Sequence, residues 1–392
     1  MMSELLESRW TETKDALLEG LDGNKKSVMA ATLENTRKYL SESATAGATS
    51  AGNVATLNRV ILPVIRRVMP TVIANELVGV QPMTGPVGQI HTLRVRYADA
   101  FDSTNGTDTA AGEEALSPFK IAEGYSGAAD DKAAQTAALE GQAGRKLSIQ
   151  ILKQTVEAKS RKLSARWTFE AAQDAQSMHG IDVEAEIMAA LAQEITAEID
   201  QEVLASLNSL AGNAAETYDQ AAVSGTATFV GDEHAALAVQ INRVANLIAQ
   251  RTRRGAGNYA VVSPFALTIL QSATTSAFAR TTEGTFEAPT NTKMVGTLNN
   301  AMKVYVNTYS ADNADVLVGY KGASESDAPA FYCPYIPLMS SGVVLDPSTF
   351  EPTVSFMTRY GYVELSNTAS SLGNAADYLG KVAITNGNVS FS

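Results

Sequence analysis

Cysteine and histidine are scarce in this sequence of 392 residues. The only cysteine, Cys333, cannot form an internal disulfide, so stability does not depend on an oxidising compartment. The three histidines, His91, His179 and His234, lie far apart and lack the spacing of metal ligands. We therefore expect each histidine at the surface or at a helix end, and Cys333 as a buried residue of an apolar strand rather than a nucleophile.

Long hydrophobic runs are missing as well. No window of about 18 residues is apolar enough to cross a bilayer. The first 24 residues carry charges throughout and contain no apolar stretch of the signal-peptide type. Aromatic residues make up only 7% of the chain, which also argues against a membrane protein. We expect no membrane partner.

Positive charge is in short supply. The chain has 30 Lys and Arg against 42 Asp and Glu, a net charge of −12. Nucleic-acid binding driven by phosphate contacts needs the opposite sign, because its affinity comes from basic residues that displace counterions. An acidic chain can enclose DNA without binding it tightly. We therefore expect DNA to be enclosed by the protein and not to be a sequence-specific ligand.

Motifs for cofactor binding and nucleophilic catalysis are not found. Gly380-Lys381 is followed by Val382, where a phosphate-binding loop needs Ser or Thr. The Gly255-Ala256-Gly257 stretch follows a predicted helix instead of opening one, and no Gly-x-Ser-x-Gly elbow occurs. The sequence therefore gives no positive case for an enzyme, a metal or a cofactor.

The chain does contain clear helical patterns, beginning near its N-terminus. Residues 1–40 predict two amphipathic helical pieces separated by Asp22-Gly23-Asn24. A linker of small residues over 41–52 has nothing to bury. This region is either a loose tail or an arm that docks on another copy. Residues 54–74 are a further apolar helix candidate.

Residues 182–209 form the clearest predicted helix. Asp182 is a good N-cap, and apolar side chains recur every four residues as one stripe. The stripe comprises Ile187, Leu191, Ile195, Ile199, Val203 and Leu207. A parallel acidic row is formed by Glu194, Glu198 and Glu202. The preferred interpretation is a solvated helix face, and the second is pairing with basic residues of another subunit. Acid–base or metal chemistry is the least favoured reading, because no histidine lies nearby on the same face.

The second half of the chain predicts one more long helix and then short strands. The helix covers 235–254 and ends in Arg251, Arg253 and Arg254, which complement the helix dipole without invoking DNA. A short helix runs from Pro264 to about Gln271, and 274–300 is expected to be a loop. The expected strands are 259–262, 302–307, 316–318, 330–332, 353–360, 362–365 and 381–384.

Two alternating strand patterns, 89–97 and 146–169, flank a stretch that cannot build a core. Residues 99–144 are rich in Gly, Ala, Asp, Thr and Ser and poor in large apolar side chains. A long two-stranded arm alone in water is marginal, and ordering it costs roughly 1–2 kcal/mol per residue. We expect a neighbouring subunit to supply the missing burial.

The segment over residues 75–90 is the most informative of all. It places two prolines and three glycines in a ten-residue bend directly ahead of a strand pattern. Its amino-acid sequence resembles a segment of the major capsid proteins of contractile-tailed, myovirus-type double-stranded DNA bacteriophages. Further segments resemble the same family in the same order: 156–163 with 170–174 and 179–180, then 318–322, 332–335 and 357–361.

The resemblance implies an α+β fold, the one shared by tailed-phage capsids and herpesvirus shell floors. Its parts would be an N-terminal arm, an extended two-stranded loop, a long spine helix, a peripheral lobe and an axial lobe. On this chain they fall as follows: arm 1–53; peripheral lobe 54–97, 169–236 with the spine helix, and 345–392; extended loop 98–168; axial lobe 237–344.

The same resemblance implies a structural role and no enzymatic one. Copies would assemble as hexamers and pentamers into an icosahedral head that encloses double-stranded DNA, in the host cytoplasm and then in the virion. The implied partners are portal, scaffolding and decoration proteins and a maturation protease. The alternatives are an encapsulin-like compartment shell and an unrelated soluble α+β enzyme. The inter-subunit candidates are Arg66, Arg67, Arg94, Arg96, Lys159, Arg161, Lys162 and Arg359.

Overall fold

The computed structural model shows an α+β protein, as expected, whose chain forms two compact units. Unit 1 comprises residues 1–88, 156–206 and 331–363, and unit 2 comprises 89–155, 207–330 and 364–392. The structure describes residues 10–11, 14–15, 17–19, 21, 23–46, 72–104, 108–113, 115, 122–127, 132–140, 144–179, 182–220, 230–273, 278–280, 292–299, 301–311, 314–325, 327–349, 351–365 and 375–385.

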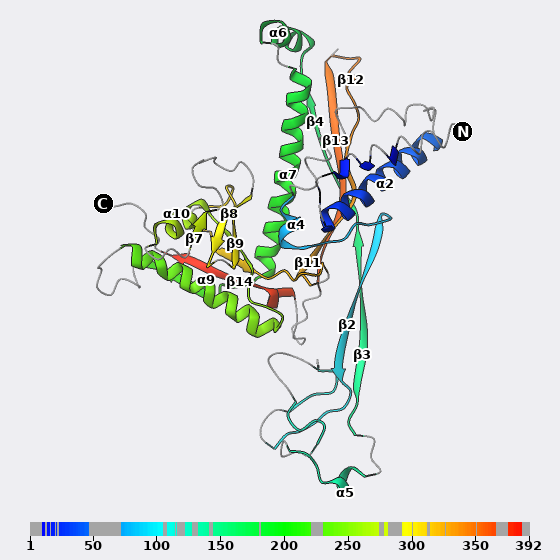
Figure 1. The fold of residues 1–392 in the computed structure, drawn as a ribbon. Helices are drawn as coiled ribbons and strands as arrows, with labels where there is room; N and C mark the ends of the chain where they lie inside the picture. Colours follow the sequence, from blue (N-terminus) through cyan, green and yellow to red (C-terminus); the bar gives the residue numbers. More distant parts are fainter. Residues whose placement is uncertain are drawn as a thin grey trace. The chain divides into compact units, whose positions relative to one another are not determined.

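Unit 1 is built around a five-stranded sheet. Its strand order is β1 (Gly79–Val80), β11 (Ala330–Ser340), β13 (Pro352–Glu364) and β12 (Val344–Leu345), and β4 (Lys159–Arg166) also pairs with β13. The β4–β13 ladder is antiparallel and joins eight residue pairs, from Thr353 opposite Arg166 to Tyr360 opposite Lys159. Figure 1 shows α7 (Val183–Leu210) alongside β4 and β13.

Helix α7 forms where the sequence predicts it. Asp182 accepts backbone hydrogen bonds from Glu184 and Ala185 at 3.1 and 3.4 Å, which satisfies two of the free N–H groups of the first turn. The stripe residues Ile195, Ile199, Val203 and Leu207 are at most 2% exposed. Burial of this stripe, rather than helix propensity alone, holds the helix in place.

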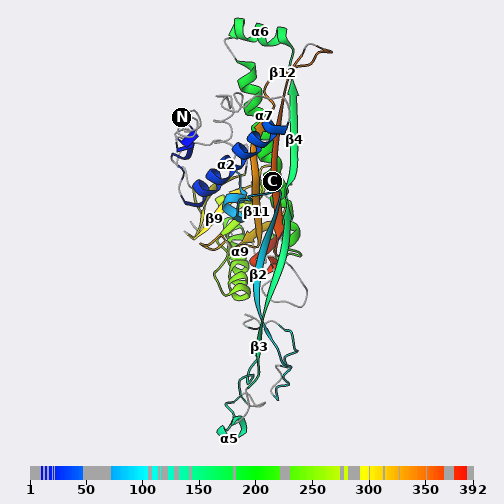
Figure 2. The same ribbon diagram turned by 90° about the vertical axis from the view of Figure 1, so that its right-hand side faces the viewer.

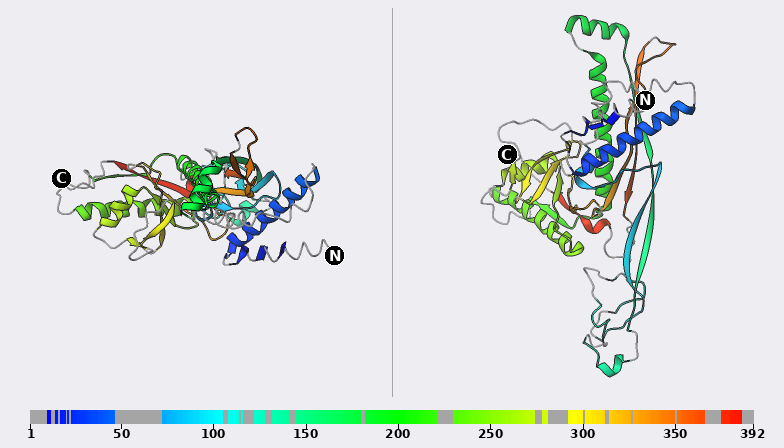
Figure 3. Two further views of the ribbon diagram at one scale, coloured as in Figure 1. Left: turned by 90° about the horizontal axis from the view of Figure 1, so that it is seen from above. Right: turned by 45° about the vertical axis from the view of Figure 1, so that its right-hand side comes forward.

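Three further helices belong to unit 1. They are α2 (Gly23–Ala46), α4 (Ala74–Leu77) and α6 (Phe169–His179). Figure 2 shows α2 beside β11, and the right-hand view of Figure 3 shows α2, in blue, next to the cyan segment that contains α4. Side-chain hydrogen bonds confirm this placement, since Asn35 of α2 bonds to the carbonyl of Tyr335 in β11.

Unit 2 contains a seven-stranded sheet covered by two helices. Its order is β5 (Glu216–Asp219), β14 (Leu379–Thr385), β10 (Val316–Gly319), β6 (Tyr259–Val262), β9 (Met302–Val306), β8 (Lys293–Leu298) and β7 (Phe278–Arg280). Helices α9 (Val230–Thr252) and α10 (Pro264–Ser272) pack their apolar sides onto it, with Leu237, Ile241 and Ile248 of α9 fully buried. A short 3-10 helix, Ala375–Tyr378, precedes β14.

The predicted two-stranded arm is present. Strands β2 (Val87–Tyr97) and β3 (Leu147–Glu157) form a separate sheet, visible in Figure 1 as a long ribbon of two strands. Leu147, Ile149 and Ile151 lie on one face of β3 and are 54%, 67% and 66% exposed. This apolar stripe is not covered by any described part of the chain.

The expectation that residues 99–144 cannot build a core is wrong in part. Tyr97, Phe101, Ala115, Ala122 and Tyr125 form a small buried cluster, and the Tyr97 and Tyr125 rings lie 4.6 Å apart. The guanidinium of Arg145 stacks over the Phe101 ring at 4.1 Å. A few aromatic rings and one cation thus replace the aliphatic residues that the stretch lacks. The short helix α5 (Thr136–Leu139) also lies in this stretch.

Other predicted boundaries need correction. Helix α2 continues through Ala46, into the residues expected to start a linker at 41, since Ala, Ser and Glu there tolerate helical geometry. The expected loop over 274–300 contains β7 and β8, which pair with each other. The strands expected at 353–360 and 362–365 are one continuous strand, β13, and the strand expected to end at Tyr332 extends to Ser340. The helix expected over 54–74 lies outside the described residues up to position 71.

We predict that Gly361→Ala lowers the free energy of unfolding by about 1–3 kcal/mol, because the added methyl group overpacks a filled site. A Cβ at Gly361 would lie 2.5 Å from a methyl of Val156 and 3.1 Å from the carbonyl of Glu157. Urea-induced unfolding of the unassembled chain measures the change. Gly85→Ala is the matched control, because its Cβ meets only one atom, at 4.0 Å. Equal stability of the two variants would contradict the prediction.

Candidate functional site

The best-formed polar site in unit 1 centres on Arg161 of β4. Its Nη1 lies 2.7 Å from Glu198 and its Nη2 lies 2.6 Å from Glu202, both on α7. Its Nε donates to the hydroxyl of Tyr360 on β13 at 2.6 Å, and that hydroxyl also bonds to Glu202. We call Arg161, Glu198, Glu202 and Tyr360 the arginine node.

The arginine node uses every nitrogen of one guanidinium. The three nitrogens bind two carboxylates and one phenol. A lysine could not make the same set of bonds, because its amine is a single point charge without the planar geometry of a guanidinium. The Arg161 and Glu202 side chains are 32% and 40% exposed, so the pairs are partly desolvated. The node therefore ties β4 and β13 to α7 by directional, charge-assisted bonds.

The charges of the node shift its titrating groups in a consistent way. Partial burial alone would raise the pKa of Glu202, but hydrogen bonds from Arg161 and Tyr360 outweigh it and hold this pKa below its ordinary value. Burial, together with the hydrogen bond to Glu202, raises the pKa of Tyr360. Glu202 is therefore ionised and Tyr360 neutral at neutral pH, and the pairs remain intact.

The node changes the interpretation of the acidic row on α7. Glu198 and Glu202 were expected to be solvated or to bind basic residues of another subunit, but they bind Arg161 of their own chain. Glu194, the third member of the row, is exposed. Both partners were visible in the sequence, and the missing information was that a strand beginning at residue 159 lies against this helix.

A second carboxylate of α7 lies in a different environment. Asp200 is 1% exposed, and one of its oxygens accepts the backbone N–H of Ile73 at 2.8 Å, directly ahead of α4. Its other oxygen is buried without a hydrogen-bond partner in the described part of the chain. Burial raises the pKa of Asp200 to about 7, although the bond from Ile73 opposes the shift. Sequence reasoning missed this residue, because an Asp inside a helix carries no signal of burial.

Aromatic side chains of the sheet complete the surroundings of α7. The Tyr332 and Tyr360 rings lie 5.4 Å apart, and Tyr332 is 2% exposed. Cys333 is buried as expected, and burial raises the pKa of its thiol to about 11. A thiol with this pKa is protonated at neutral pH and is not an activated nucleophile.

The other predicted interface residues are placed differently. Lys159 and Lys162 are exposed on β4, and the Arg359 guanidinium lies 5.3 Å from the centre of the Tyr335 ring. Arg96 on β2 is half-buried. Arg66 and Arg67 lie outside the described residues, as does the side chain of Arg94. The structure therefore brings Lys159, Arg161, Lys162 and Arg359 onto the paired strands β4 and β13.

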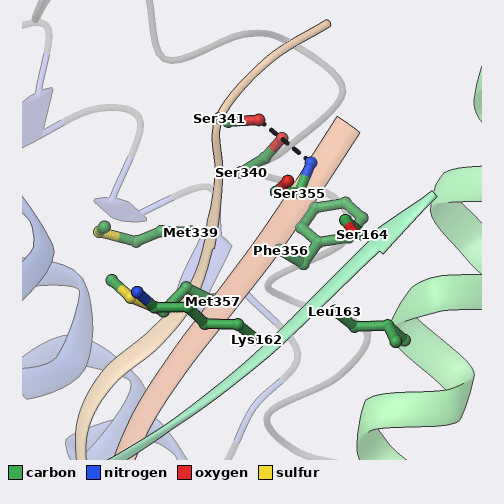
Figure 4. Close-up of a pocket in the computed structure, with 9 residues that line it drawn as sticks. All are labelled: Lys162, Leu163, Ser164, Met339, Ser340, Ser341, Ser355, Phe356 and Met357. Carbon is green, nitrogen blue, oxygen red and sulfur yellow. Dashed lines mark hydrogen bonds between the residues drawn. The ribbon is translucent and has the colours of Figure 1, made fainter. Parts of the chain in front are cut away.

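A hollow of about 450 Å³ opens beside Lys162. Figure 4 shows Ser340, Ser341 and Ser355 at one end of it, where the backbone N–H of Ser355 donates to the Ser341 hydroxyl at 3.1 Å. Met339, Met357 and Lys162 lie toward the other end. Among the described residues, the lining has hydroxyls and one amine and no carboxylate or imidazole.

The remaining predicted residues do not form a reactive site. Arg254 pairs with Asp327 at 2.6 Å, so part of the basic triplet is engaged within unit 2. His234 was expected at the surface or a helix end; it lies near the start of α9 but is 1% exposed and bonds to Ser272. His91 is exposed, and the side chain of His179 is not among the described ones.

Within the described ranges, no three or more His, Cys, Asp or Glu side chains are grouped so that they could hold a metal ion. No helix in those ranges combines the length and the apolar character needed to cross a membrane.

Comparison with known proteins gives consistent matches. The family profile for major capsid protein Gp23 matches residues 54–384. The major capsid protein of Vibrio phage KVP40 is 30% identical over 417 aligned residues, which cover 83% of this chain and 80% of that protein. The major capsid protein of Enterobacteria phage T4 is 30% identical over 411, covering 82% and 78%. A chain in the solved structure of Mycobacterium phage Bobi aligns with a TM-score of 0.48 and 14% identity, covering 88% and 98%.

We predict that Arg161→Lys lowers the free energy of unfolding by about 0.5–1.5 kcal/mol, because the exposed Glu198 and the half-buried Glu202 lose directional partners. Urea-induced unfolding at neutral pH measures it. Lys162→Ala is the control, since this neighbouring side chain is exposed and should change stability by no more than about 0.5 kcal/mol. A loss in the control as large as in the variant would assign the effect to the strand and not to the node.

We predict that Asp200→Asn changes the pH dependence of stability. The pKa of Asp200 rises from 3.8 to about 7 on folding, so the wild-type chain loses stability as pH rises through this range. The loss amounts to at most about 4 kcal/mol. The variant should match the wild type near pH 4 and exceed it above pH 7 in urea unfolding. Parallel curves for both proteins from pH 4 to 8 would contradict this, and the exposed Asp174→Asn provides the control.

Proposed function

The chain belongs to the Gp23 family of major capsid proteins, and we propose that its copies assemble as hexamers and pentamers into an icosahedral head around double-stranded DNA. It is a structural protein of a myovirus-type virion. The observation that carries the proposal is the family match over residues 54–384, together with 30% identity over most of the chain. We propose no enzymatic activity for it.

The geometry of the arginine node supports a mechanical role. A shell protein must transmit load between its contacts without unfolding, and directional ionic bonds between a helix and two strands resist shear better than apolar contact alone. In unit 1, Arg161 supplies such bonds between α7, β4 and β13. The site binds elements of one chain together, which is what a tile in a shell requires.

The exposed apolar stripe on β3 supports contact with another copy. Leu147, Ile149 and Ile151 are each more than half exposed, although they occupy alternate positions on one strand face. Stripes of this kind on soluble proteins mark interaction surfaces. A neighbouring copy in the shell would cover the stripe and so stabilise the extended loop.

The division of the chain follows from the family. We propose 1–53 as the N-terminal arm, 98–168 as the extended loop and 237–344 as the axial lobe at the centre of each hexamer or pentamer. The peripheral lobe would comprise 54–97, 169–236 and 345–392, with α7 as the spine helix. Two strands cross these proposed bounds, since β14 pairs with β10 in the sheet of unit 2 and β11 pairs with β13 in the sheet of unit 1.

Interfaces and partners form a second layer of the proposal. Lys159, Lys162 and Arg359 are exposed or half-buried on neighbouring strands and are the better placed candidates for inter-subunit contacts. Arg161 is a weaker one, because its guanidinium is occupied within the chain. Such rim charges set register more than affinity. Portal, scaffolding and decoration proteins and a maturation protease are proposed from the family.

The test is electron microscopy of the full chain expressed alone and with its neighbouring genes. We expect closed shells or hexameric rings in at least one condition, and shells purified from infected cells should contain double-stranded DNA. A uniform monomer in both conditions would overturn the proposal. Closed shells filled with protein cargo and free of DNA would favour a cellular compartment instead.

A further inference from the structure

The tip of the extended loop buries its aromatic rings without help from another copy. In the single chain, Tyr97, Phe101 and Tyr125 are 9%, 4% and 8% exposed. The Phe101 and Tyr125 rings meet edge to face, with their centres 6.2 Å apart. We call the described residues from Tyr97 to Lys146 the loop head, which Figure 1 shows beyond the ends of β2 and β3. Because aromatic rings are the largest apolar groups that a short segment can bury, the head has a core of its own.

The two ends of the loop head are clamped together. Ala98 donates its backbone N–H to the carbonyl of Lys146 at 2.9 Å, and the Lys146 N–H donates to the Asp99 carboxylate at 2.9 Å. The Tyr125 hydroxyl donates to the same Lys146 carbonyl at 2.7 Å. The chain therefore returns at residue 146 to the place that it left at residue 98, and a side chain from the aromatic core takes part in closing it.

Backbone hydrogen bonds join the inner segments of the head to the end of β2. The Tyr97 N–H donates to the carbonyl of Glu113 at 2.9 Å, and the Gly112 N–H donates to the carbonyl of Tyr97 at 2.7 Å. Phe101 and Thr109 exchange two such bonds, at 2.8 and 2.7 Å. Gly112 has a φ of +85°, which glycine adopts without strain. These backbone groups find their partners inside the head, as buried backbone groups must.

Arg145 connects the aromatic core to the clamp. Its guanidinium lies 4.1 Å from the centre of the Phe101 ring and 5.9 Å from that of Tyr125. Its Nη1 lies 3.4, 3.0 and 3.3 Å from the carbonyl oxygens of Gly124, Tyr125 and Gly127. An aromatic face attracts a cation, and a guanidinium carries enough N–H groups to serve several carbonyls. One side chain thus holds the turn at 124–127 onto the core, directly before the clamp.

The ribbon beside the head is in the opposite state. Leu147, Ile149 and Ile151 of β3 are each more than half exposed in the same chain. The ribbon therefore needs the apolar surface of a partner to offset the entropy lost when it is ordered, whereas the head buries its rings by itself. A segment that is ordered before contact adds no ordering cost to the association step.

We propose that the loop head is a conformational device that folds before assembly. The unassembled chain already holds the head in its final form, with Arg145 as the residue that fixes it. A neighbouring copy then meets a rigid head and orders only the ribbon. The neighbouring copy is taken from the proposed function, whereas the folding of the head does not depend on it.

Hydrogen exchange of the full, unassembled chain, isolated by size exclusion and read by mass spectrometry, tests the proposal. We expect peptides covering 97–103 and 108–115 to exchange at least roughly tenfold slower than an unstructured chain. Arg145→Gln should remove most of this protection and leave β6, in the same unit, unchanged. Lys146→Gln is the matched control, because it removes a neighbouring exposed charge while the clamp uses the backbone of this residue.

Two further measurements complete the test. Tyr125→Phe keeps the ring and removes the hydroxyl bond to Lys146, so exchange should become faster in peptides covering 97–103 and 144–147. This variant decides the matter if Arg145→Gln lowers protection throughout unit 2. In closed shells, exchange should slow over 147–157 and stay as it was in the head.

Each outcome has one meaning. Exchange of the wild-type head at the rate of an unstructured chain overturns the proposal, as does unchanged protection in Arg145→Gln or an equal loss in Lys146→Gln. Loss of protection throughout unit 2 in Tyr125→Phe, or slowing in the head on assembly as large as in the ribbon, also overturns it. Because the exchange of the unassembled chain involves no shell, failure to form shells overturns the proposed function and leaves the folding of the head intact.

Discussion

The constraint on which unit 1 depends is that a helix of 28 residues must be held against strands distant in sequence. Apolar burial along α7 supplies attraction but little direction, since a smooth stripe can slide and rotate. The guanidinium of Arg161 removes this freedom by reaching Glu198, Glu202 and Tyr360 at once. Strand β4, which carries Arg161, follows β3 along the chain with only Ala158 between them.

Two neighbouring carboxylates of α7 show how environment decides chemistry. Glu202 is surrounded by donors, and its pKa is lowered. Asp200 is buried with one backbone donor, and burial raises its pKa to about 7. In an enzyme, such a divergent pair would suggest an acid and a base. Here neither faces the hollow beside Lys162, and both contact other parts of the fold, so the pair has a structural explanation.

The sequence allowed part of this fold to be predicted, and the reasons are local. The stripe and cap of α7, strand β6 and helix α10 depend on residues within a few turns, and their bounds agree closely with expectation. The arginine node was missed because its members lie up to 199 residues apart. The loop-tip cluster was missed because Phe101 and Tyr125 are isolated aromatics in a polar stretch, and only their meeting makes a core. Glu202 was expected on a solvated helix face, and its actual role depends on Arg161 and Tyr360, which the sequence does not show to be its neighbours.

The docking of α2 on β1 and β11 has a consequence for how the chain is made. Asn35 bonds to Tyr335, a residue 300 positions later, and β1 is completed only by β11. The ribosome synthesises α2 long before β11. During most of translation, α2 therefore lacks the strand to which Asn35 binds. Because domains fold as units during synthesis, docking is among the last events and reports that both ends of unit 1 are present. A chain truncated before residue 335 would carry α2 but not the complete strand on which α2 docks, and so would differ in structure from a finished protomer before it could enter a growing shell.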